Sequence, residues 1–449
     1  MDPAAIGDPV ATPITPSRPR IGVVAINAGN ANLGDEAVLT GALLAIRTRM
    51  GDPDITVFSV NPAATAEHHR VRAASLPIGS VGGAGNGPIR RAAHRMWDPL
   101  RGMRILAPAG RWSVRLGRAV ASLVALPVAI TRLALQLRGT DVMILAGSNQ
   151  LEDAPGGAWG YPFMVLLCTV LARLSGARVA FMSVGAGPLG SRLSQRLCVA
   201  ALRLTTYASF RDKGSLELMQ GLGYRGAGKV VPDLAYALEL PAQDTRGHVA
   251  PKRVAVNVFP FHDPLYDQRV TDGGASFAEY VEAIADFVIG VNARGMQLVL
   301  FGTQHGDRHA IDLIQERVHA RAPELGVIEQ LMPTSYEELG DIIERSDVVV
   351  ATRYHGILVG TLHGRPTIGV CYEAKSKRLL ELAGIEQFAV EADMLQADAL
   401  LDRLTDALRP GGLSEQIRAR AEDMHHECLN GVSEALERCI PQLAVESRA

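Results

Sequence analysis

From Arg20 onward, short apolar runs alternate with stretches of helical periodicity, and this alternation most limits what the chain can fold into. Repeated strand–helix units predict parallel sheets that are covered by helices on both faces. The apolar runs form two series of expected strands, 20–27, 55–60, 141–147, 178–185 and 207–211, then 253–259, 297–302, 347–352 and 367–372. A polar, proline-containing stretch at 241–252 separates the two series and reads as a linker.

The length of 449 residues and the hydrophobic content of 47% are enough for two cores. We therefore expect an α/β protein with two Rossmann-like domains that face each other across a cleft. Val38, Leu39, Leu43 and Ile46 recur on one helical face, which we expect to pack on the first sheet. The expected divisions are a flexible tail over 1–19, an N-terminal domain over 20–240, a C-terminal domain over 253–392, and helices over 393–449 that are broken around Pro410.

Charge and cysteine usage exclude several classes of partner. The formal net charge is -2, so the chain has no overall positive field that would favour nucleic acid, and any anion site must be local. The five cysteines contain no CxxC pair, which favours buried thiols of a reducing cytosol over disulfides or zinc. Residues 1–19 lack a basic start followed by an apolar core, so they do not resemble a signal peptide. We expect a cytoplasmic protein.

Residues 79–118 break the strand–helix pattern. A glycine-rich stretch is followed by eight arginines and a single acid, Asp98. Two interpretations stay open: a solvated basic excursion, or a surface that docks anionic lipid or an anionic glycan carrier. The apolar run that follows, 119–131, is too short to span a membrane. The apolar helix expected over 119–137 favours peripheral contact with the inner membrane face.

Parallel sheets bind ligands at the carboxyl ends of their strands, because helix N-termini present unpaired N–H groups there. The first such loop, 27–36, contains glycines, Asn30 and Asp35. It is not a GxGxxG loop, and no acid follows at the distance that a nicotinamide cofactor requires. Asp35 either contributes to a site or caps the helix that starts near it.

Two further loops of the first half carry polar side chains. After the strand at 141–147 come Asn149 and Asp153, whose amide and carboxylate groups suit the hydroxyls of a sugar. The strand at 207–211 delivers Arg211 to the sheet edge, where a guanidinium group can donate two hydrogen bonds to a carboxylate or phosphate. The alternative for Arg211 is an ion pair with a neighbouring acid, Asp212 or Glu217.

In the second half, an apolar strand runs into Arg353, Tyr354 and His355 before a helix of small residues. Residues two apart on a strand point to the same side, so we expect Arg353 and His355 to face the cleft together. A histidine there can act as acid or base near neutral pH.

Gln304 and Lys375 follow other strands of this half. The segment from Gln304 to His309, with His305 and Asp307, fits no standard metal spacing, so we expect no metal.

Several segments, taken in order, carry a family resemblance: Gly34-Asp35-Glu36-Ala37, Phe210-Arg211-Asp212 with Ser215, Gly302-Thr303-Gln304 with Asp307, Thr352-Arg353-Tyr354-His355-Gly356, and Gly364-Arg365-Pro366 with Tyr372 and Lys375. Together they resemble the polysaccharide pyruvyl transferase family over roughly residues 20–390. The resemblance implies a glycosyltransferase-like (GT-B-like) pair of domains, phosphoenolpyruvate as donor with no cofactor, and a sugar of a cell-surface glycan or lipid-linked oligosaccharide as acceptor.

Carried over by position, the resemblance implies that Arg211 and Arg353 hold the donor's phosphate and carboxylate and that His355 is the acid–base residue. We group Tyr354, Gln304 and Lys375 with them on the donor side. Asn30, Asp35, Asn149 and Asp153 form the expected acceptor side, with Asp153 as a further catalytic candidate. Here the chain departs from the family, because Ala146-Gly147-Ser148-Asn149 replaces the usual run of glycines.

Two other functions fit the same architecture. One is a glycosyltransferase that uses a nucleotide sugar, and the other is a non-catalytic glycan-binding protein. Two arginines with one histidine suit a small trianionic donor better than a nucleotide sugar.

Overall fold

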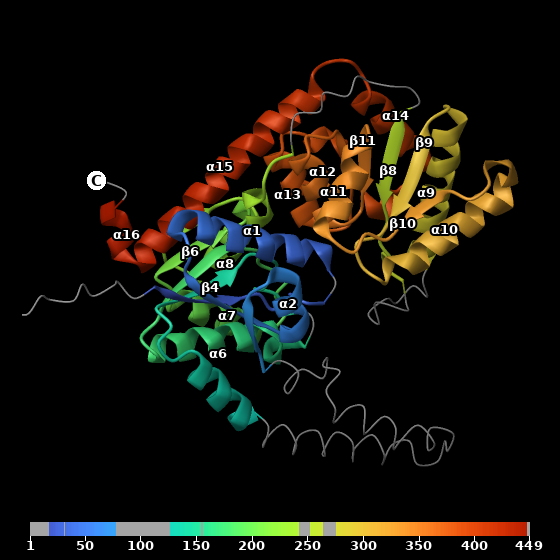
Figure 1. Ribbon diagram of the computed structural model, residues 1–449. Coiled ribbons are helices and arrows are strands. Elements are labelled where there is room, and N and C mark those ends of the chain that lie inside the picture. The colour runs from blue at the N-terminus through green and yellow to red at the C-terminus, as the bar shows by residue number, and fades with distance from the viewer. Residues whose placement is uncertain are drawn as a thin grey trace, which may run out of the picture.

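The computed structural model describes residues 18–30, 32–77, 126–153, 156–241, 252–263 and 275–446. In them the chain forms two parallel sheets, one in each domain (Figure 1). The N-terminal sheet has the strand order β3-β2-β1-β4-β5-β6-β7. Its strands are β1 (Arg20–Val24), β2 (Asp54–Ser59), β3 (Arg72–Ser75), β4 (Val142–Ala146), β5 (Arg178–Val184), β6 (Tyr207–Phe210) and β7 (Gly228–Val230).

The C-terminal sheet has the order β10-β9-β8-β11-β12-β13. It is made of β8 (Arg253–Asn257), β9 (Gln297–Phe301), β10 (Glu329–Leu331), β11 (Val348–Ala351), β12 (Thr367–Cys371) and β13 (Ala389–Glu391). In each sheet the order reverses at one point, between β1 and β4 and between β8 and β11. Such a reversal opens a crevice at the carboxyl ends of the strands. The two Rossmann-like domains expected from the sequence are confirmed.

All nine expected strands are present, and the sequence analysis missed four others, β3, β7, β10 and β13. Each missed strand is the edge of its sheet and has only three or four residues. An edge strand pairs on one side only and stays partly exposed, so it does not carry the apolar run by which a central strand is recognised.

Helices cover both faces of the N-terminal sheet. Its helices are α1 (Leu33–Met50), α2 (Pro62–His69), an unlabelled helix Leu126–Gln136, α6 (Tyr161–Leu174), α7 (Arg192–Arg203) and α8 (Lys213–Gly221), with the 3-10 turns η3 (Gly157–Trp159) and η4 (Leu234–Ala237). Along β4, Val142 and Ile144 belong to the core cluster beneath α1, whereas Met143 and Leu145 belong to the cluster beneath α6 and α7. This alternation fills both faces because side chains point to opposite sides of a strand.

The expected apolar face of the first helix is confirmed: its four residues are buried in the same cluster as one face of the N-terminal sheet. The C-terminal domain adds α9 (Ala275–Ala293), α10 (Asp307–Arg321), α11 (Tyr336–Glu344), α12 (Tyr354–Leu362), α13 (Ala374–Leu382) and α14 (Ala397–Ala407), with the 3-10 turns η5 (Pro323–Leu325), η6 (Glu386–Phe388) and η7 (Ala392–Met394). The chain ends with α15 (Leu413–Cys439) and α16 (Pro441–Glu446).

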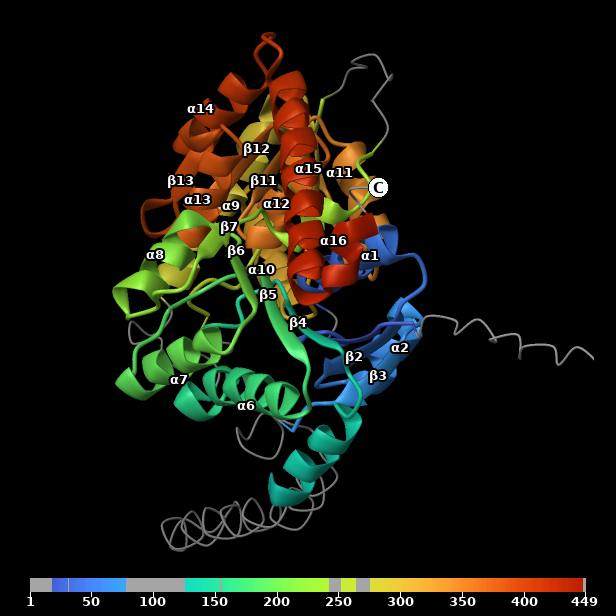
Figure 2. The ribbon, with the colours of Figure 1, turned by 90° about the vertical axis from the view of Figure 1, so that its left-hand side faces the viewer.

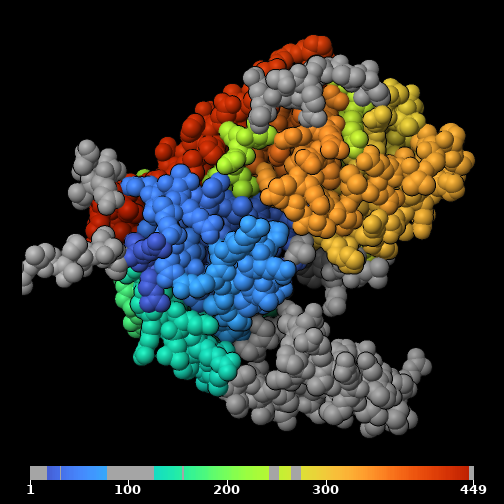
Figure 3. Space-filling view, viewed as in Figure 1, coloured from blue at the N-terminus to red at the C-terminus, as the bar shows by residue number. Residues whose placement is uncertain are grey.

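The long helix α15 joins the two domains. It contacts α1, β5, β6 and η4 on the N-terminal side and α12 on the C-terminal side. Figure 2 shows it running down from the C-terminal domain to the N-terminal domain, and Figure 3 shows the blue N-terminal surface in direct contact with the orange C-terminal surface. A buried hydrogen bond of 2.9 Å between the hydroxyls of Tyr236 and Thr361 adds to this contact. The two strand ends that carry site loops are therefore held facing each other.

All five cysteines are buried free thiols, as expected. Burial raises the pKa of Cys168, Cys198 and Cys371 to about 12, so these thiols stay protonated. Almost all of the expected tail 1–19 and the basic segment 79–118 lie outside the described residues.

Candidate active site

Side chains of the two domains meet in the crevice. Arg211 follows β6 of the N-terminal sheet, and Tyr354 begins α12 of the C-terminal domain. The guanidinium carbon of Arg211 lies 4.4 Å from the centre of the Tyr354 ring, a cation–π distance. The loop before α1 is also tied to the other domain, because the Leu33 amide donates to the Thr303 carbonyl at 3.5 Å. The candidate site is thus one interdomain site.

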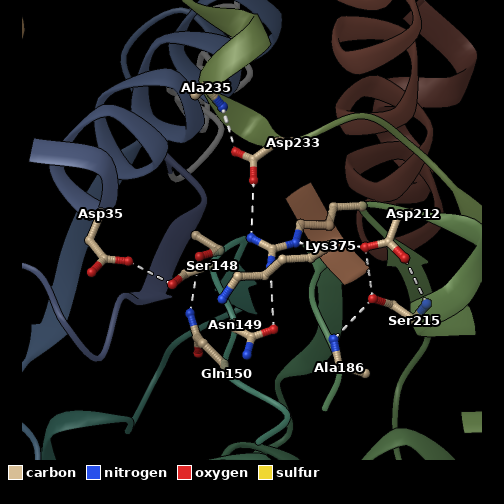
Figure 4. A network of polar contacts seen from close by, with 12 residues as sticks. Asp35, Ser148, Asn149, Gln150, Ala186, Asp212, Ser215, Asp233, Ala235 and Lys375 are labelled. Atoms are coloured by element: carbon tan, nitrogen blue, oxygen red, sulfur yellow. Dashed lines mark hydrogen bonds and ion pairs between the residues drawn. The ribbon is translucent and has the colours of Figure 1, made fainter. Parts of the chain in front are cut away.

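Arg211 is almost fully buried, with 3% of its side chain exposed. Its guanidinium group lies 3.5 Å from a carboxylate oxygen of Asp233 and 3.8 Å from one of Asp212, and it donates to Asn149 at 3.3 Å. Figure 4 shows Asp233, Asn149 and Asp212 pointing toward one centre. Of the two ion pairs considered from the sequence, the one with Asp212 is present, while Glu217 pairs with Lys213 instead.

A glycine makes room for this arrangement. A Cβ on Gly185, at the end of β5, would lie 2.6 Å from the Asn149 side-chain oxygen and 2.8 Å from the Arg211 guanidinium group. Both distances are shorter than any real van der Waals contact of a methyl group. Gly185 therefore lets the buried arginine lie directly on the backbone that follows β5.

Arg353 is the N-cap of α12 and is less buried than Arg211, with 15% of its side chain exposed. It forms a two-pronged ion pair with Asp307 and stacks over Phe259 at 4.4 Å. Asp307 is fully buried and also accepts hydrogen bonds from the amides of Thr303 and Gln304. Gln304 thus lies in the loop that holds the partner of Arg353.

His355 lies in the first turn of α12, and Arg353 just before it. We had expected the alternation of a strand to orient these two residues, and this was wrong, because β11 ends at Ala351. The start of α12 orients them instead. A Cβ on Gly34 would lie 1.9 Å from Nδ1 of His355, so the glycine of the Gly34-Asp35-Glu36 motif is the only residue type that lets the N-terminus of α1 reach this histidine. Among the described residues, Nε2 of His355 is buried without a hydrogen-bond partner.

The electrostatics of His355 are unusual. Burial, and then the nearby charges of Arg211, Lys375 and Arg353, lower the pKa of His355 to about 3. The imidazole is therefore neutral at pH 7 in the unliganded protein. Three cations from three different strand ends surround one neutral, unpaired imidazole, which is the arrangement expected where an anion is to bind beside an acid–base group.

Lys375 lines the cavity beside Arg211 from the C-terminal domain. It lies in the first turn of α13, pairs with Glu373, and lines a cavity of about 260 Å³ with Asn149, Arg211 and Arg378. Neither Arg353 nor Glu373, the N-caps of α12 and α13, uses its side chain to cap its helix. The first amides of both helices are therefore available to an anion.

The sequence analysis missed one carboxylate of this site, Glu152. It accepts a hydrogen bond from the Asn149 side-chain amide. Burial raises the pKa of Glu152 to about 7, although Lys375 and Asn149 act in the opposite direction. The structure places Asp153 elsewhere: one of its carboxylate oxygens accepts from the amides of Gly190 and Ser191, in the loop before α7.

Asp35 lies in the first turn of α1 and does not cap it, because the N-cap is Asn32. The Asp35 carboxylate is buried and accepts hydrogen bonds from Ser148 at 2.6 Å and from Asn32 at 2.7 Å (Figure 4 shows the bond to Ser148). Burial raises its pKa. Ser148 has φ +57°, a backbone conformation that favours glycine, at the point where the family has its glycine run. Its hydroxyl bond to Asp35 compensates for that conformation.

The structure brings together the expected residues Arg211, Arg353, Tyr354, His355, Lys375 and Asn149, with Gln304 and Asp35 at the margin. It does not bring Asn30 or Asp153 into this group. Asn30 is exposed in the loop before α1, and Asn32 makes the polar contacts of that loop. The acidic pair at 152–153 was visible in the sequence, but which acid turns inward depends on the path of the loop after β4.

Within the described ranges, one group of three side chains is close enough to hold a metal ion, and it is Glu36 with His68 and His69. Glu36 instead pairs with His69 at 2.6 Å and accepts from the Gly29 amide at 2.8 Å. In the segment from Gln304 to His309, Asp307 forms an ion pair with Arg353. Nε2 of His309 lies 3.5 Å from a carboxylate oxygen of Asp263.

Comparison with known proteins extends these observations. The family described as polysaccharide pyruvyl transferase matches residues 32–373. The amylovoran biosynthesis protein AmsJ of Erwinia amylovora is 22% identical over 410 residues, which cover 87% of this chain and 92% of AmsJ.

Solved structures share the fold at low sequence identity. HepE of Anabaena, solved in complex with UDP-glucose, superimposes with a TM-score of 0.55 at 12% identity, covering 93% of this chain and 99% of HepE. UDP-GlcNAc 2-epimerase of Neisseria meningitidis gives 0.55 at 8% identity, covering 94% of this chain and all of the epimerase. These likenesses confirm the GT-B-like arrangement of the two domains.

Proposed function

The chain belongs to the polysaccharide pyruvyl transferase family, and from this premise we propose that it transfers a pyruvyl group from phosphoenolpyruvate to two hydroxyls of one sugar in a polysaccharide or its precursor. The likeness to a protein of amylovoran biosynthesis supports an exopolysaccharide as the product. The observation that carries the proposal is the group of Arg211, Arg353 and Lys375 around His355.

This group suits a small, highly charged donor. Phosphoenolpyruvate carries about three negative charges, and arginine side chains and uncapped helix N-termini bind phosphate and carboxylate groups. The cavity of about 260 Å³ beside Arg211 lies below the range of roughly 300–1,000 Å³ that is typical of sites for larger ligands. This volume suits a ligand as small as phosphoenolpyruvate.

The reaction balances with the side chains present. A proton from His355 is added to the methylene carbon of phosphoenolpyruvate, and one sugar hydroxyl adds to the adjacent carbon C2. The C2–O bond to phosphate then breaks, and the second hydroxyl closes the cyclic ketal. Of the two hydroxyl protons, one replaces the proton that His355 delivered to the new methyl group, and the other leaves with phosphate.

His355 must gain a proton before it can donate one, because its pKa of about 3 keeps it neutral in the unliganded protein. Binding of the donor raises the pKa of His355. Negative charge placed among Arg211, Lys375 and Arg353 offsets the cations that lower the histidine pKa, so the donor-bound site favours imidazolium. Donor binding and protonation of the acid are thereby coupled.

Glu152 is the proposed base for the acceptor hydroxyl. Glu152→Gln should lower kcat by about 100-fold, at the lower end of general base effects, because water in the open cleft can still take the proton. A base with a pKa of about 7 is ionised above that pH, so wild-type activity should rise with pH up to about 7, and it should fall again at higher pH where the donor-bound His355 loses its proton. The variant should lose this acidic limb in a pH–rate profile.

Asp153→Asn is the matched control, since it removes the neighbouring acid. Its carboxylate accepts hydrogen bonds from the loop amides of Gly190 and Ser191, outside the group around His355, so turnover should stay within a few-fold of wild type. If Asp153→Asn loses activity and Glu152→Gln does not, the base is Asp153.

The proposed function is tested first by donor binding. Phosphoenolpyruvate at a hundred times its Kd should stabilise the fold by about 2.7 kcal/mol, measured as a rise in Tm. Phosphate release should then depend on an acceptor, tested with lipid-linked and nucleotide-linked sugars. Stabilisation by a UDP-sugar and not by phosphoenolpyruvate would favour the nucleotide-sugar transferase, and stabilisation by glycan alone would favour a binding protein.

A further inference from the structure

One helix of the N-terminal domain is apolar on both of its faces. The inner face of α6, with Met164, Val165 and Cys168, is buried in the core. The outer face repeats apolar residues at helical spacing: Trp159 just before the helix, then Phe163, Leu166, Leu167, Val170, Leu171 and Leu174. Leu166, Leu167 and Leu171 are partly buried against the core, and the two ends are exposed. Trp159 and Leu174, at the two ends, are 56% and 78% exposed.

The stretch Gly157–Leu174 is long and apolar enough to cross a membrane, yet 44% of it is buried in the protein. To span a bilayer it would have to leave the core that its inner face builds. A helix that is apolar all round but anchored on one side is suited to lie at a membrane surface with its outer face in the lipid.

A second apolar helix, Leu126–Gln136, contributes Leu133 to the same core cluster as α6. In this segment Leu133 is buried, whereas Val128 and Leu135 are 50% and 54% exposed. Figures 1 and 2 show α6 and this helix on the side of the N-terminal domain turned away from the C-terminal domain. The exposed apolar side chains of the two helices therefore belong to a side of the domain that leaves the cleft free.

The charged side chains on these helices have one sign. Residues 126–140 and 156–177 contain no Asp or Glu, and neither does α7 next to α6. The exposed arginines are Arg132, Arg138 and Arg173 around the two apolar helices and Arg192, Arg196 and Arg203 on α7. None of these six arginines forms an ion pair with an acid in the part of the chain that the structure describes. A second copy of this face would bring like charges together, whereas an anionic surface would neutralise them.

We propose that the face formed by α6, the Leu126–Gln136 helix and the arginines of α7 binds the surface of an anionic bilayer. The apolar side chains enter the boundary between headgroups and acyl chains, and the arginines contact anionic headgroups. This surface is separate from the cleft, so the bound protein keeps its cleft open to an acceptor at the membrane.

Flotation of the full-length protein with vesicles tests the proposal without any substrate, so its outcome does not depend on the proposed function. The protein should bind phosphatidylglycerol–phosphatidylcholine vesicles and not pure phosphatidylcholine. The double variant V128E/L135E should weaken binding by at least roughly tenfold, because it places two carboxylates in the apolar face. The triple variant R132Q/R138Q/R173Q should weaken it by about 100-fold at low salt, from roughly fivefold per basic residue.

The matched control is V327E/M394E, which makes the same kind of change at two exposed apolar residues of the C-terminal domain, 85% and 74% exposed. It should bind as wild type does. A variant with Trp159 as its single tryptophan, made by Trp97→Phe and Trp112→Phe, should shift its emission to the blue on binding. Unchanged Tm in each variant shows that folding is intact. The proposal is overturned if wild type does not bind, if V128E/L135E binds equally well, or if the face proves to pair two copies in solution.

Discussion

Replacing His355 with glutamine is expected to lower kcat by two to four orders of magnitude, the usual contribution of a general acid or base. Glutamine can still form a hydrogen bond in the space beside Gly34, but it cannot take up and deliver a proton. KM for phosphoenolpyruvate should stay close to the wild-type value, because the donor is held by the arginines and the lysine. Steady-state phosphate release measures both constants.

His426→Gln is a suitable control, since His426 is exposed on α15 outside the cleft. It should be fully active. The acid–base role of His355 is ruled out by full activity in a folded His355→Gln protein. A variant that fails to fold would instead indicate that the histidine mainly supports the packing between α1 and α12, and Tm separates these outcomes.

Replacing Arg211 with alanine should lower the free energy of unfolding by about 3–5 kcal/mol, because it leaves a buried carboxylate without its counter-charge. Asp233 has no exposed side-chain surface, and Arg211 is its ion-pair partner at 3.5 Å. The same variant should lose the stabilisation by phosphoenolpyruvate. Urea denaturation with and without the donor measures both effects.

Arg317→Ala provides the comparison at the surface. Arg317 pairs with Glu282 at 2.6 Å, but both side chains are nearly half exposed, so its loss should cost at most about 1 kcal/mol. Adding Asp233→Asn to Arg211→Ala should recover part of the stability, since it removes the unpaired charge. An equal cost for the two arginines would contradict the buried ion pair.

The residues expected on the donor side lie together because of how parallel sheets are built. Arg211 and Arg353 each follow a central apolar strand, and the carboxyl ends of such strands meet at one edge. The sequence could therefore indicate both arginines and His355 without any knowledge of the domain arrangement. It could not show that each arginine is held by a buried acid, because Asp233 and Asp307 come from other loops.

The acceptor side was harder to predict. The loop after β4 has two adjacent acids, and only its folded path decides that Glu152 enters the site while Asp153 holds the loop before α7. In the same way Asn32, and not Asp35, caps α1, because the cap is set by backbone angles that composition does not specify.

The sequence by itself determined the two-domain α/β class, the nine central strands and the loops in which chemistry was to be sought. It could do so because a strand buried on both faces needs a continuous apolar run, and that run is local in the chain. Tertiary structure alone decided the edge strands, the contact of Arg211 with Tyr354, the place of Gly34 against His355, and the perturbed pKa values of His355 and Glu152. These features depend on distances between residues far apart in the chain and on the burial they create, and no local pattern encodes either.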